Sequence, residues 1–107
     1  MNKVKRGEVW LVDLGLAAKV RPCLVISIPS WDNERALVTL LAHTTSPRHT
    51  RFEVKVETGF LREGVFDAQN LVTIPQVKLL KKLGDLNLED ISHIETRIRL
   101  WLGLQSN

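Results

Sequence analysis

Short apolar runs, separated by polar segments that contain glycine or proline, make up most of the chain. Residues 23–26 (Cys-Leu-Val-Ile) are continuously apolar, which is typical of a strand buried on both faces. Pro22 precedes this run and favours extended geometry at Arg21, and a proline fits the first residue of a strand better than its middle. The pattern therefore predicts a core strand over about 20–27, with Arg21 at its entrance.

Four other segments have the composition of strands, namely residues 7–14, 36–42, 52–57 and 65–73. The run 52–57 alternates apolar and charged residues with period two, which indicates a half-exposed strand. The connection between the first two strands is short, so we expect them to be antiparallel neighbours. We also expect a bend near Asp67, an end to the last strand at Pro75, and a helical turn over 76–80.

The C-terminal stretch has helical periodicity. Asn87 is a suitable N-cap, and two acidic residues follow in the first turn, where the helix dipole favours them. Leu88, Ile91, Ile94, Ile98 and Trp101 or Leu102 lie on one predicted face. Gly103 follows as a stop signal. These features predict one amphipathic helix over about 88–102.

The order of elements predicts a mainly β fold of the α+β type. Five or so short strands and a terminal helix are typical of a small, strongly bent antiparallel sheet or barrel with a helix packed on it. A chain of 107 residues with 44% hydrophobic content is sufficient for one core. We therefore expect a single domain over residues 1–107.

Composition narrows the setting of the protein. A lone cysteine, Cys23, forms no intrachain disulfide, so we expect a reducing, cytoplasmic compartment. No apolar segment follows the basic N-terminus, and we expect neither a signal peptide nor a membrane span. A formal net charge of +3 and a pI of about 9.4 favour an anionic partner only weakly, because many small basic proteins bind no nucleic acid.

Candidate chemistry is concentrated in residues 43–51, which hold two histidines, two arginines and four hydroxyl side chains. This segment is either a solvated loop or a phosphate-binding loop, because hydroxyls and guanidiniums are the usual donors to phosphate oxygens. Cys23 and the three histidines show no metal-ligand spacing, and we expect no metal or cofactor. Trp31, in a polar loop, is the tryptophan expected to be exposed, whereas Trp10 and Trp101 are expected in the core.

Five short motifs, in order along the chain, carry a resemblance to a known family. They are Arg6-Gly7-Glu8-Val9-Trp10 with Asp13-Leu14, Arg21-Pro22 with Leu24-Val25-Ile26-Ser27, Thr44-Thr45 with Phe52-Glu53-Val54, Leu71-Val72-Thr73-Ile74, and Lys82-Leu83-Gly84-Asp85-Leu86. With them the chain resembles the MazF/PemK toxins of bacterial type II toxin–antitoxin systems. The resemblance implies an SH3-like barrel with a C-terminal helix, as in MazF, Kid and CcdB.

The family resemblance also implies an activity and partners. Its members are metal-independent, sequence-specific endoribonucleases (mRNA interferases) that cleave single-stranded RNA and inhibit growth. The ribose 2′-hydroxyl attacks the adjacent phosphorus, which gives a 2′,3′-cyclic phosphate or 3′-phosphate and a 5′-hydroxyl. The implied partners are single-stranded RNA, a second copy of the chain in a homodimer, and a MazE-like antitoxin with an acidic tail, together with which such toxins bind DNA.

Carried over by position, Arg21 matches the catalytic arginine of the family and Thr44 matches its threonine partner. Arginine remains protonated, so Arg21 suits stabilisation of transition-state charge rather than base catalysis. The candidate acid–base groups are His43, His49 and Glu8. His43 precedes Thr44, and on a continuing strand it would point to the opposite face. The expected RNA-binding residues are Lys19, Trp31, Thr45, Ser46, Arg48 and Arg51.

The chain differs from the family pattern at two places, and two other functions are alternatives to RNA cleavage. Gln69 and Asp67 occupy positions where some members carry an arginine and an acidic residue, so that pair is not transferred. The segment 15–20 is shorter than the loop that shapes the RNA groove in many members. The alternatives are a toxin of the same fold that binds DNA gyrase, as CcdB does, and a non-catalytic interaction module. The gyrase-binding toxin would not require Arg21 beside Thr44.

Overall fold

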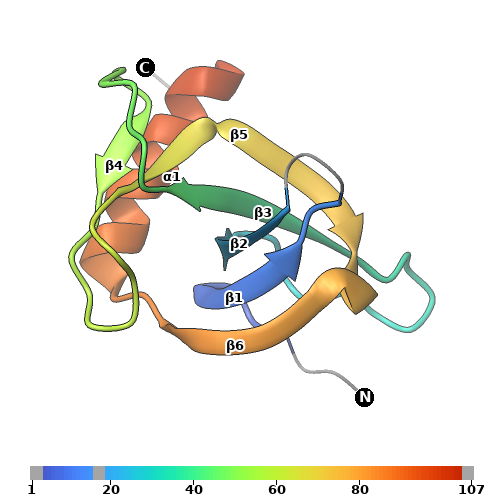
Figure 1. Cartoon of the computed structure of the whole chain (residues 1–107). Coiled ribbons are helices and arrows are strands. Elements are labelled where there is room, and N and C mark those ends of the chain that lie inside the picture. Colours follow the sequence, from blue (N-terminus) through green and yellow to red (C-terminus); the bar gives the residue numbers. More distant parts are fainter. Residues whose placement is uncertain (1–3, 16–18, 105–107) are drawn as a thin grey trace.

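The computed structural model describes residues 4–15 and 19–104 (Figure 1). Its strands are β1 (Glu8–Asp13), β2 (Val20–Val25), β3 (Leu37–Thr44), β4 (Glu53–Lys55), β5 (Val65–Pro75) and β6 (Leu79–Asp85), and the 3₁₀ turn η2 (Gln76–Lys78) joins the last two. Helix α1 (Leu88–Leu102) follows. The described elements thus form a mainly β fold with one terminal α-helix, as the sequence predicts.

All six strands belong to one antiparallel sheet in the order β4-β5-β3-β2-β1-β6. The sheet curves strongly, so that β5 and β6 lie on opposite sides of the central strands (Figure 1). Among the described residues, β4 and β6 pair on one side only. The fold is therefore barrel-like, but the sheet is open rather than closed.

Strand β2 is buried on both faces, which confirms the interpretation of its continuous apolar run. Cys23 and Val25 pack in one apolar cluster, and Leu24 packs in the other. Burial raises the pKa of the Cys23 thiol to about 12, so it stays protonated and unreactive. Pro22 is the third residue of the strand, not the first. It is tolerated there because β2 pairs with β3 only from Cys23 onward.

The prediction of a helical turn over 76–80 is wrong for residues 79 and 80. Only Gln76–Lys78 form a 3₁₀ turn, and Leu79–Asp85 form the edge strand β6, which pairs with β1. The sequence pattern hides this strand because Leu79 is its one buried residue. An edge strand that pairs on one side and faces solvent needs no regular apolar alternation.

Two strand lengths also differ from the prediction. β3 continues through His43 and Thr44, so these residues belong to a strand rather than to the following loop. Conversely, only Glu53–Lys55 of the predicted segment 52–57 are paired as β4. Phe52 and Val56 are nevertheless buried while Lys55 is exposed, so the alternation identified the apolar face correctly.

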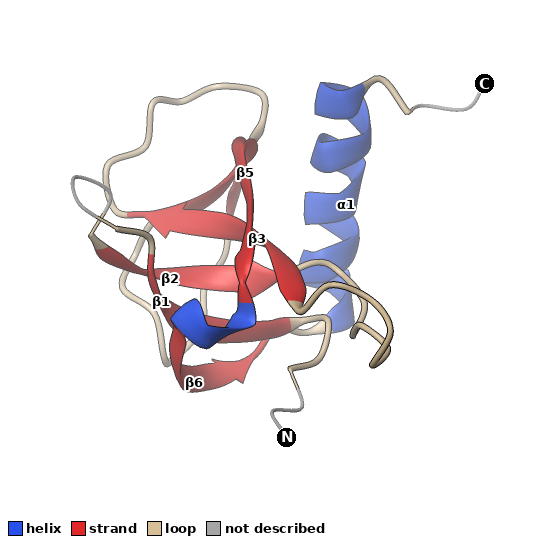
Figure 2. Ribbon diagram, turned by 90° about the vertical axis from the view of Figure 1, so that its right-hand side faces the viewer, coloured by secondary structure: helices blue, strands red, loops and turns tan. Residues whose placement is uncertain are grey.

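Helix α1 has the predicted bounds and packs against β4 and β5 (Figure 2). The Asn87 side chain accepts a hydrogen bond from the Asp90 N–H at 2.8 Å, and Gly103 adopts a left-handed conformation at its end. The apolar face is narrower than predicted. Ile94 is buried, but Leu88 is 83% exposed and Leu102 is 50% exposed. Among the described residues, no helix is long and apolar enough to cross a membrane.

Candidate active site

Arg21 and Thr44 come from neighbouring antiparallel strands that meet at one end of the sheet. The β2–β3 register pairs Cys23 with Ala42, and its continuation by two residues would set Arg21 opposite Thr44. Both residues line one groove of about 740 Å³. The two positions that the family resemblance joins are therefore neighbours in the structure.

The Thr44 hydroxyl is oriented by the chain that follows it. Its Oγ1 accepts a hydrogen bond from the backbone N–H of Ser46 at 3.0 Å. This local side-chain-to-backbone turn leaves the hydroxyl proton available for a ligand. Ser46 itself also lines the groove. Thr44 can therefore donate a hydrogen bond to a phosphate oxygen while its own position is held.

A register break in β5 supplies polar groups that sequence reasoning did not assign to the site. Leu41 pairs with Leu71, but His43 pairs with Phe66, so residues 67–70 lie opposite a single residue of β3. Bulges of this kind redirect side chains near functional sites. Three of these residues, Asp67, Gln69 and Asn70, line the groove. The bend expected near Asp67 has its counterpart here.

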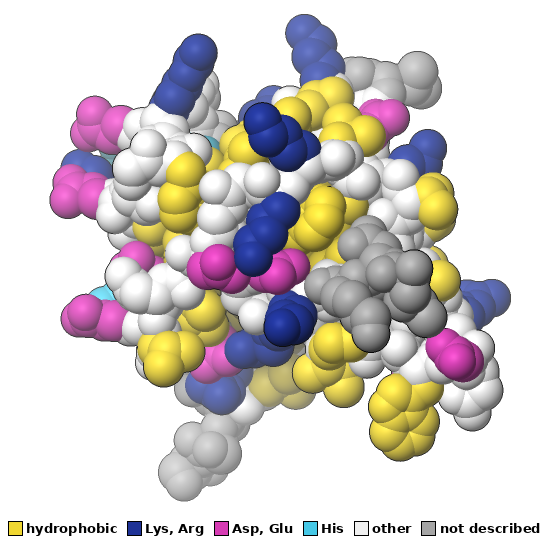
Figure 3. Space-filling view, turned by 90° about the horizontal axis from the view of Figure 1, so that it is seen from below, with side chains coloured by type: hydrophobic (Ala, Val, Ile, Leu, Met, Phe, Trp, Pro, Cys, Tyr) yellow, Lys and Arg dark blue, Asp and Glu magenta, His cyan; other side chains and the backbone are white. Residues whose placement is uncertain are grey.

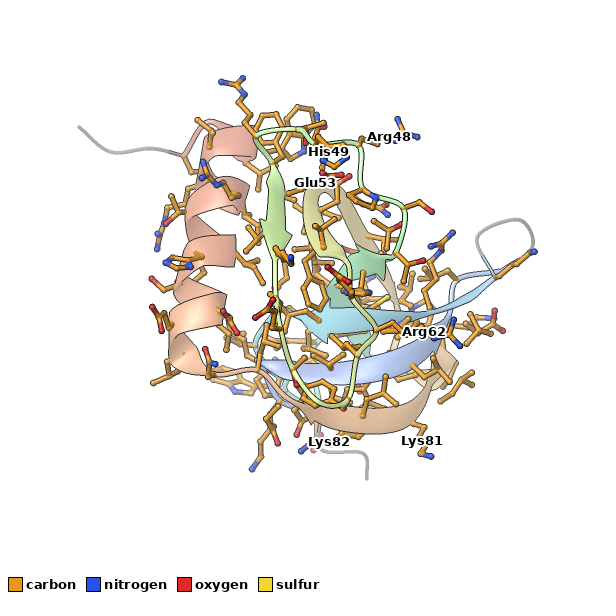
Figure 4. All side chains as sticks on the ribbon, turned by 60° about the vertical axis from the view of Figure 1, so that its left-hand side comes forward. Arg48, His49, Glu53, Arg62, Lys81 and Lys82 are labelled. Atoms are coloured by element: carbon orange, nitrogen blue, oxygen red, sulfur yellow. The ribbon has the colours of Figure 1, made fainter. Side chains whose placement is uncertain are left out.

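The loop between β3 and β4 is held by one carboxylate, Glu53. Its two oxygens accept backbone hydrogen bonds from Arg48 at 2.8 Å, from His49 at 2.7 Å and from Thr50 at 3.3 Å. Desolvation alone would raise the pKa of Glu53, but these hydrogen bonds outweigh it and lower the pKa. Glu53 lines the groove as well, and Figure 4 shows it beneath Arg48 and His49. It therefore orders the loop that borders Thr44.

His43 does not lie in the Arg21–Thr44 groove. It is 3% exposed and its ring meets Phe66 edge-on at 5.0 Å, because alternation along β3 turns it away from Thr44. It lines a second pocket, which Arg21 shares. Burial lowers the pKa of His43, so the imidazole is neutral near pH 7. Its Nε2 has no hydrogen-bond partner among the described residues.

The other predicted loop residues have different surroundings. His49 is exposed with a φ of 64° and lines a separate pocket beside Glu53. Arg48 lines the groove itself. Arg51 instead lies over the Phe52 ring, with its guanidinium carbon 4.7 Å from the ring centroid. Thr45 lines both the pocket of His49 and the pocket that His43 shares with Arg21. The loop thus places Arg48, but not Arg51, in the groove.

Glu8 is a structural residue in this arrangement and does not line the groove. It is 6% exposed and accepts hydrogen bonds from the Lys5 N–H and the Trp10 indole, each at 3.0 Å. Lys82 Nζ lies 3.1 Å from its other oxygen. Burial alone would raise the pKa of Glu8, but these donors lower it. A carboxylate so fully engaged is a poor candidate for the general base.

Two tryptophans occupy unexpected or remote positions. Trp31 is 75% exposed, as predicted, but it lies in the loop after β2, at the strand end opposite Arg21. Trp101 was predicted in the core, yet it is 44% exposed and lines the groove. Its ring meets Phe52 edge-on, with centroids 5.4 Å apart. Helical periodicity did not reveal this role, because it depends on where α1 ends relative to the sheet.

The structure has a bent, open antiparallel sheet with a helix after its last strand, which is the fold that the family resemblance implies. Arg21 and Thr44 line one groove of this fold. The sequence profile described as PemK-like, MazF-like toxin of type II toxin–antitoxin system matches residues 5–102. The chain belongs to this family.

Individual relatives agree with that assignment. The chain is 30% identical over 104 residues to Endoribonuclease MazF4 of Mycobacterium tuberculosis, which covers 97% of each protein. Endoribonuclease MazF1 of Mycobacterium bovis matches with the same identity and coverage. Among solved structures, a mycobacterial endoribonuclease in complex with its cognate antitoxin is 26% identical, with a TM-score of 0.84 over 98% of this chain and 100% of that chain.

More distant structures show the fold alone. A MazE–MazF complex from Deinococcus radiodurans is 16% identical, with a TM-score of 0.80 over 96% of this chain and 98% of that chain. The sheet and helix are therefore retained at low sequence identity. The predicted fold class and family are confirmed.

Proposed function

We propose that the chain is a metal-independent, sequence-specific endoribonuclease toxin that cleaves single-stranded RNA by attack of the ribose 2′-hydroxyl on the adjacent phosphorus. The observation that carries this proposal is the pair Arg21 and Thr44, which line one groove from neighbouring strands. Membership of a family with endoribonucleases supports it. The products would be a 2′,3′-cyclic phosphate or 3′-phosphate and a 5′-hydroxyl.

Arg21 stabilises the charge that develops on the phosphate in the transition state. The guanidinium is permanently protonated, and its planar donor fork matches phosphate oxygens. It can also donate a hydrogen bond to the departing 5′-oxygen. Pro22 stiffens the backbone from which it projects. The Thr44 hydroxyl donates a hydrogen bond to the same phosphate, because its oxygen is held by the backbone N–H of Ser46.

His43 is the acid–base candidate that shares a pocket with Arg21. Its lowered pKa keeps the imidazole neutral, which a proton acceptor for the 2′-hydroxyl requires. His49 lines a separate pocket, which has Thr45 in common with the pocket of His43. The pH profiles of kcat for His43→Gln and His49→Gln test the two. Loss of the acidic limb of the profile in one variant identifies the base, and an unchanged profile in both excludes them.

The main test is cleavage of single-stranded RNA in EDTA. Wild-type protein should cleave, Arg21→Ala should lower the rate by about 10²–10³, and an RNA with a 2′-deoxy substitution at the mapped cut should not be cleaved. Arg35→Ala, at an exposed loop position away from the groove, is the charge-matched control and should leave the rate unchanged. Cleavage by Arg21→Ala at the wild-type rate, cleavage of the 2′-deoxy RNA, or a requirement for a divalent metal would contradict the mechanism. Inhibition of DNA gyrase without RNA cleavage would support the CcdB-like alternative.

The antitoxin-binding role extends the proposal to a protein partner. A related mycobacterial endoribonuclease was solved with its antitoxin, and the loop 47–51 provides Arg48 and Arg51 for an acidic tail. Because Arg51 already lies over Phe52, Arg48→Glu should weaken the complex more than Arg51→Glu, most clearly at low salt. Unchanged affinity in both variants would exclude this loop from the interface.

Assembly and location complete the proposal. By family analogy the chain forms a homodimer, acts in the cytoplasm, and binds DNA only together with its antitoxin. Sedimentation of the purified chain tests the first statement. A monomer at micromolar concentration would contradict it. Cell fractionation and a DNA-binding assay with and without the antitoxin test the other two.

A further inference from the structure

The second pocket, which His43 shares with Arg21, differs from the groove in the charges of its lining residues. The groove is lined by two acids, Glu53 and Asp67, as well as by Arg21 and Arg48. The second pocket, of about 550 Å³, contains Lys19, Arg21 and Arg62 and no acidic residue among those that line it. Arg21 is common to both. A polyanion held at Arg21 can therefore continue into a pocket that is purely cationic.

Neither of the two additional cations is neutralised by a neighbour. Within residues 4–15 and 19–104, Lys19 and Arg62 form no ion pair. Glu63, which follows Arg62 in sequence, lies 3.4 Å from Lys55 instead. Figure 4 shows Arg62 apart from the Arg48–His49–Glu53 group. The charges of Lys19 and Arg62 are thus not paired with an acidic side chain among the described residues.

The face on the β6 side of the molecule has mixed charge. Seen from below, the face on the β6 side carries lysine and arginine side chains next to acidic ones (Figure 3). Lys82, for example, contacts both Glu8 at 3.1 Å and Asp85 at 3.3 Å. Such paired charges attract an anion weakly. The second pocket therefore differs from a generally basic surface.

The remaining lining suits a nucleotide. Thr45 supplies a hydroxyl, and Phe60 supplies an aromatic ring. A Cβ added at Gly84 would lie 2.6 Å from the Phe60 ring, so the ring is supported closely from β6. Aromatic faces of this kind stack on unpaired bases without strong sequence preference. Cations with an adjacent aromatic ring are the usual combination for single-stranded nucleic acid.

We infer that Lys19 and Arg62 form a phosphate-binding subsite, with Phe60 as its base platform, for the nucleotide next to the scissile phosphate. The inference rests on the proposed function, because it extends the RNA from Arg21 into the second pocket. It adds Arg62 and Phe60, on the loop between β4 and β5, to the RNA-binding residues. Arg62 binds RNA uniformly in ground and transition states, so its loss raises KM and leaves kcat unchanged.

The first measurement is the salt dependence of binding to an RNA that is 2′-deoxy at the cut. One lost phosphate contact lowers the slope of log K against log salt by about 0.7 for single-stranded nucleic acid. Arg62→Ala should show this reduction and a several-fold weaker affinity at low salt. Arg35→Ala removes the same charge from an exposed loop away from both pockets, and it should match wild type. A wild-type slope for Arg62→Ala would overturn the subsite.

A methylphosphonate scan of the RNA identifies the phosphate directly. Neutralising one phosphate beside the cut should weaken binding by wild type several-fold and have no additional effect on Arg62→Ala. Equal losses in the two proteins at every position would contradict the inference. So would unchanged RNA binding combined with weakened binding of the acidic antitoxin, which would assign the pocket to that partner. Failure of wild type to cleave any RNA would instead contradict the proposed function.

Discussion

Glu8 and Glu53 make similar local contacts in two different regions of the molecule. Each carboxylate accepts two or more hydrogen bonds, and each has a lowered pKa. Glu8 is buried and joins β1 to Lys82 on β6. Glu53 is half-buried at the groove, and all three of its hydrogen-bond donors are backbone N–H groups of one loop.

The difference shows how one type of interaction serves stability in one region and function in another. The Glu8 contacts connect elements of the framework, so their loss should act on the whole fold. The Glu53 contacts shape a loop that borders Thr44, so their loss should act on the site with little effect on global unfolding. The same distinction holds for the arginines, because Arg6 pairs with Glu95 on α1 while Arg48 faces the groove.

The largest expected effect is at Gly64, where the groove region meets the framework. A Cβ at this position would lie 2.2 Å from the Thr44 carbonyl oxygen and 2.8 Å from His43 Cε1. Gly64→Ala should therefore displace β3 at Thr44, lower stability by about 1–3 kcal/mol and reduce RNA cleavage strongly. Gly59→Ala, in the same loop with nothing within 4 Å, should leave both unchanged. Equal behaviour of the two variants would contradict the packing described here.

Removal of the Glu8 charge should affect stability alone. Glu8→Gln leaves the donors from Lys5, Trp10 and Lys82 without their anionic acceptor, and about 1–3 kcal/mol of unfolding free energy should be lost at pH 7. Because the pKa of Glu8 is lowered in the folded state, its contribution is present above pH 4.5 and disappears as the pH falls through the folded-state pKa. Urea unfolding of wild type and Glu8→Gln at pH 7 and pH 3 measures the lost unfolding free energy and its dependence on pH. If Glu8→Gln is fully folded but no longer cleaves RNA, Glu8 takes part in the reaction and is not only structural.

In contrast to Glu8→Gln, substitution of Glu53 should lower RNA cleavage and leave global stability nearly unchanged. Glu53→Gln should lower kcat/KM at least about tenfold by releasing the loop beside Thr44, with less than about 1 kcal/mol lost from global stability. Hydrogen exchange at the N–H groups of Arg48, His49 and Thr50 should accelerate. If exchange at these amides is unchanged, or if stability falls as far as in Glu8→Gln, the contrast between the two regions is wrong.

The smallest effect concerns pH and His43. Burial lowers the pKa of His43 from its usual 6.5, so the unfolded chain binds a proton that the folded chain does not. Stability should therefore decrease as the pH falls below about 6.5. The difference in unfolding free energy between pH 7.5 and pH 5.5 should be smaller in His43→Gln than in wild type. An unchanged or larger difference would contradict a neutral buried imidazole.

The sequence pattern predicted the elements in which the spacing of apolar residues matches the residues that are buried. β2 is recognisable from Cys23, Leu24 and Val25, which are buried on both faces, and α1 from its cap and its isoleucine spacing. β6 was missed because an edge strand with one buried residue leaves no apolar pattern. Local sequence determines whether a segment is extended, but not whether another strand pairs with it.

The site was predicted in part, and for a specific reason. Arg21 and Thr44 were paired through the family resemblance, since only the strand register, with Cys23 opposite Ala42, brings them together. Gln69 and Asn70 enter the groove because of the break in the β3–β5 register. Trp101 does so because of where α1 ends on the sheet. Neither a strand register nor the place where a helix end lies relative to the sheet can be derived from one sequence.

The central claim is that Arg21 and Thr44 act together on one phosphate, and a double-mutant cycle of kcat/KM tests it most directly. Arg21→Ala should lower kcat/KM by about 10²–10³, Thr44→Val should lower it less, and Thr44→Ser should restore most of the activity. Because the two groups contact the same phosphate, the double variant should be little worse than Arg21→Ala alone. Fully multiplicative losses, or full activity in Thr44→Val, would contradict the account.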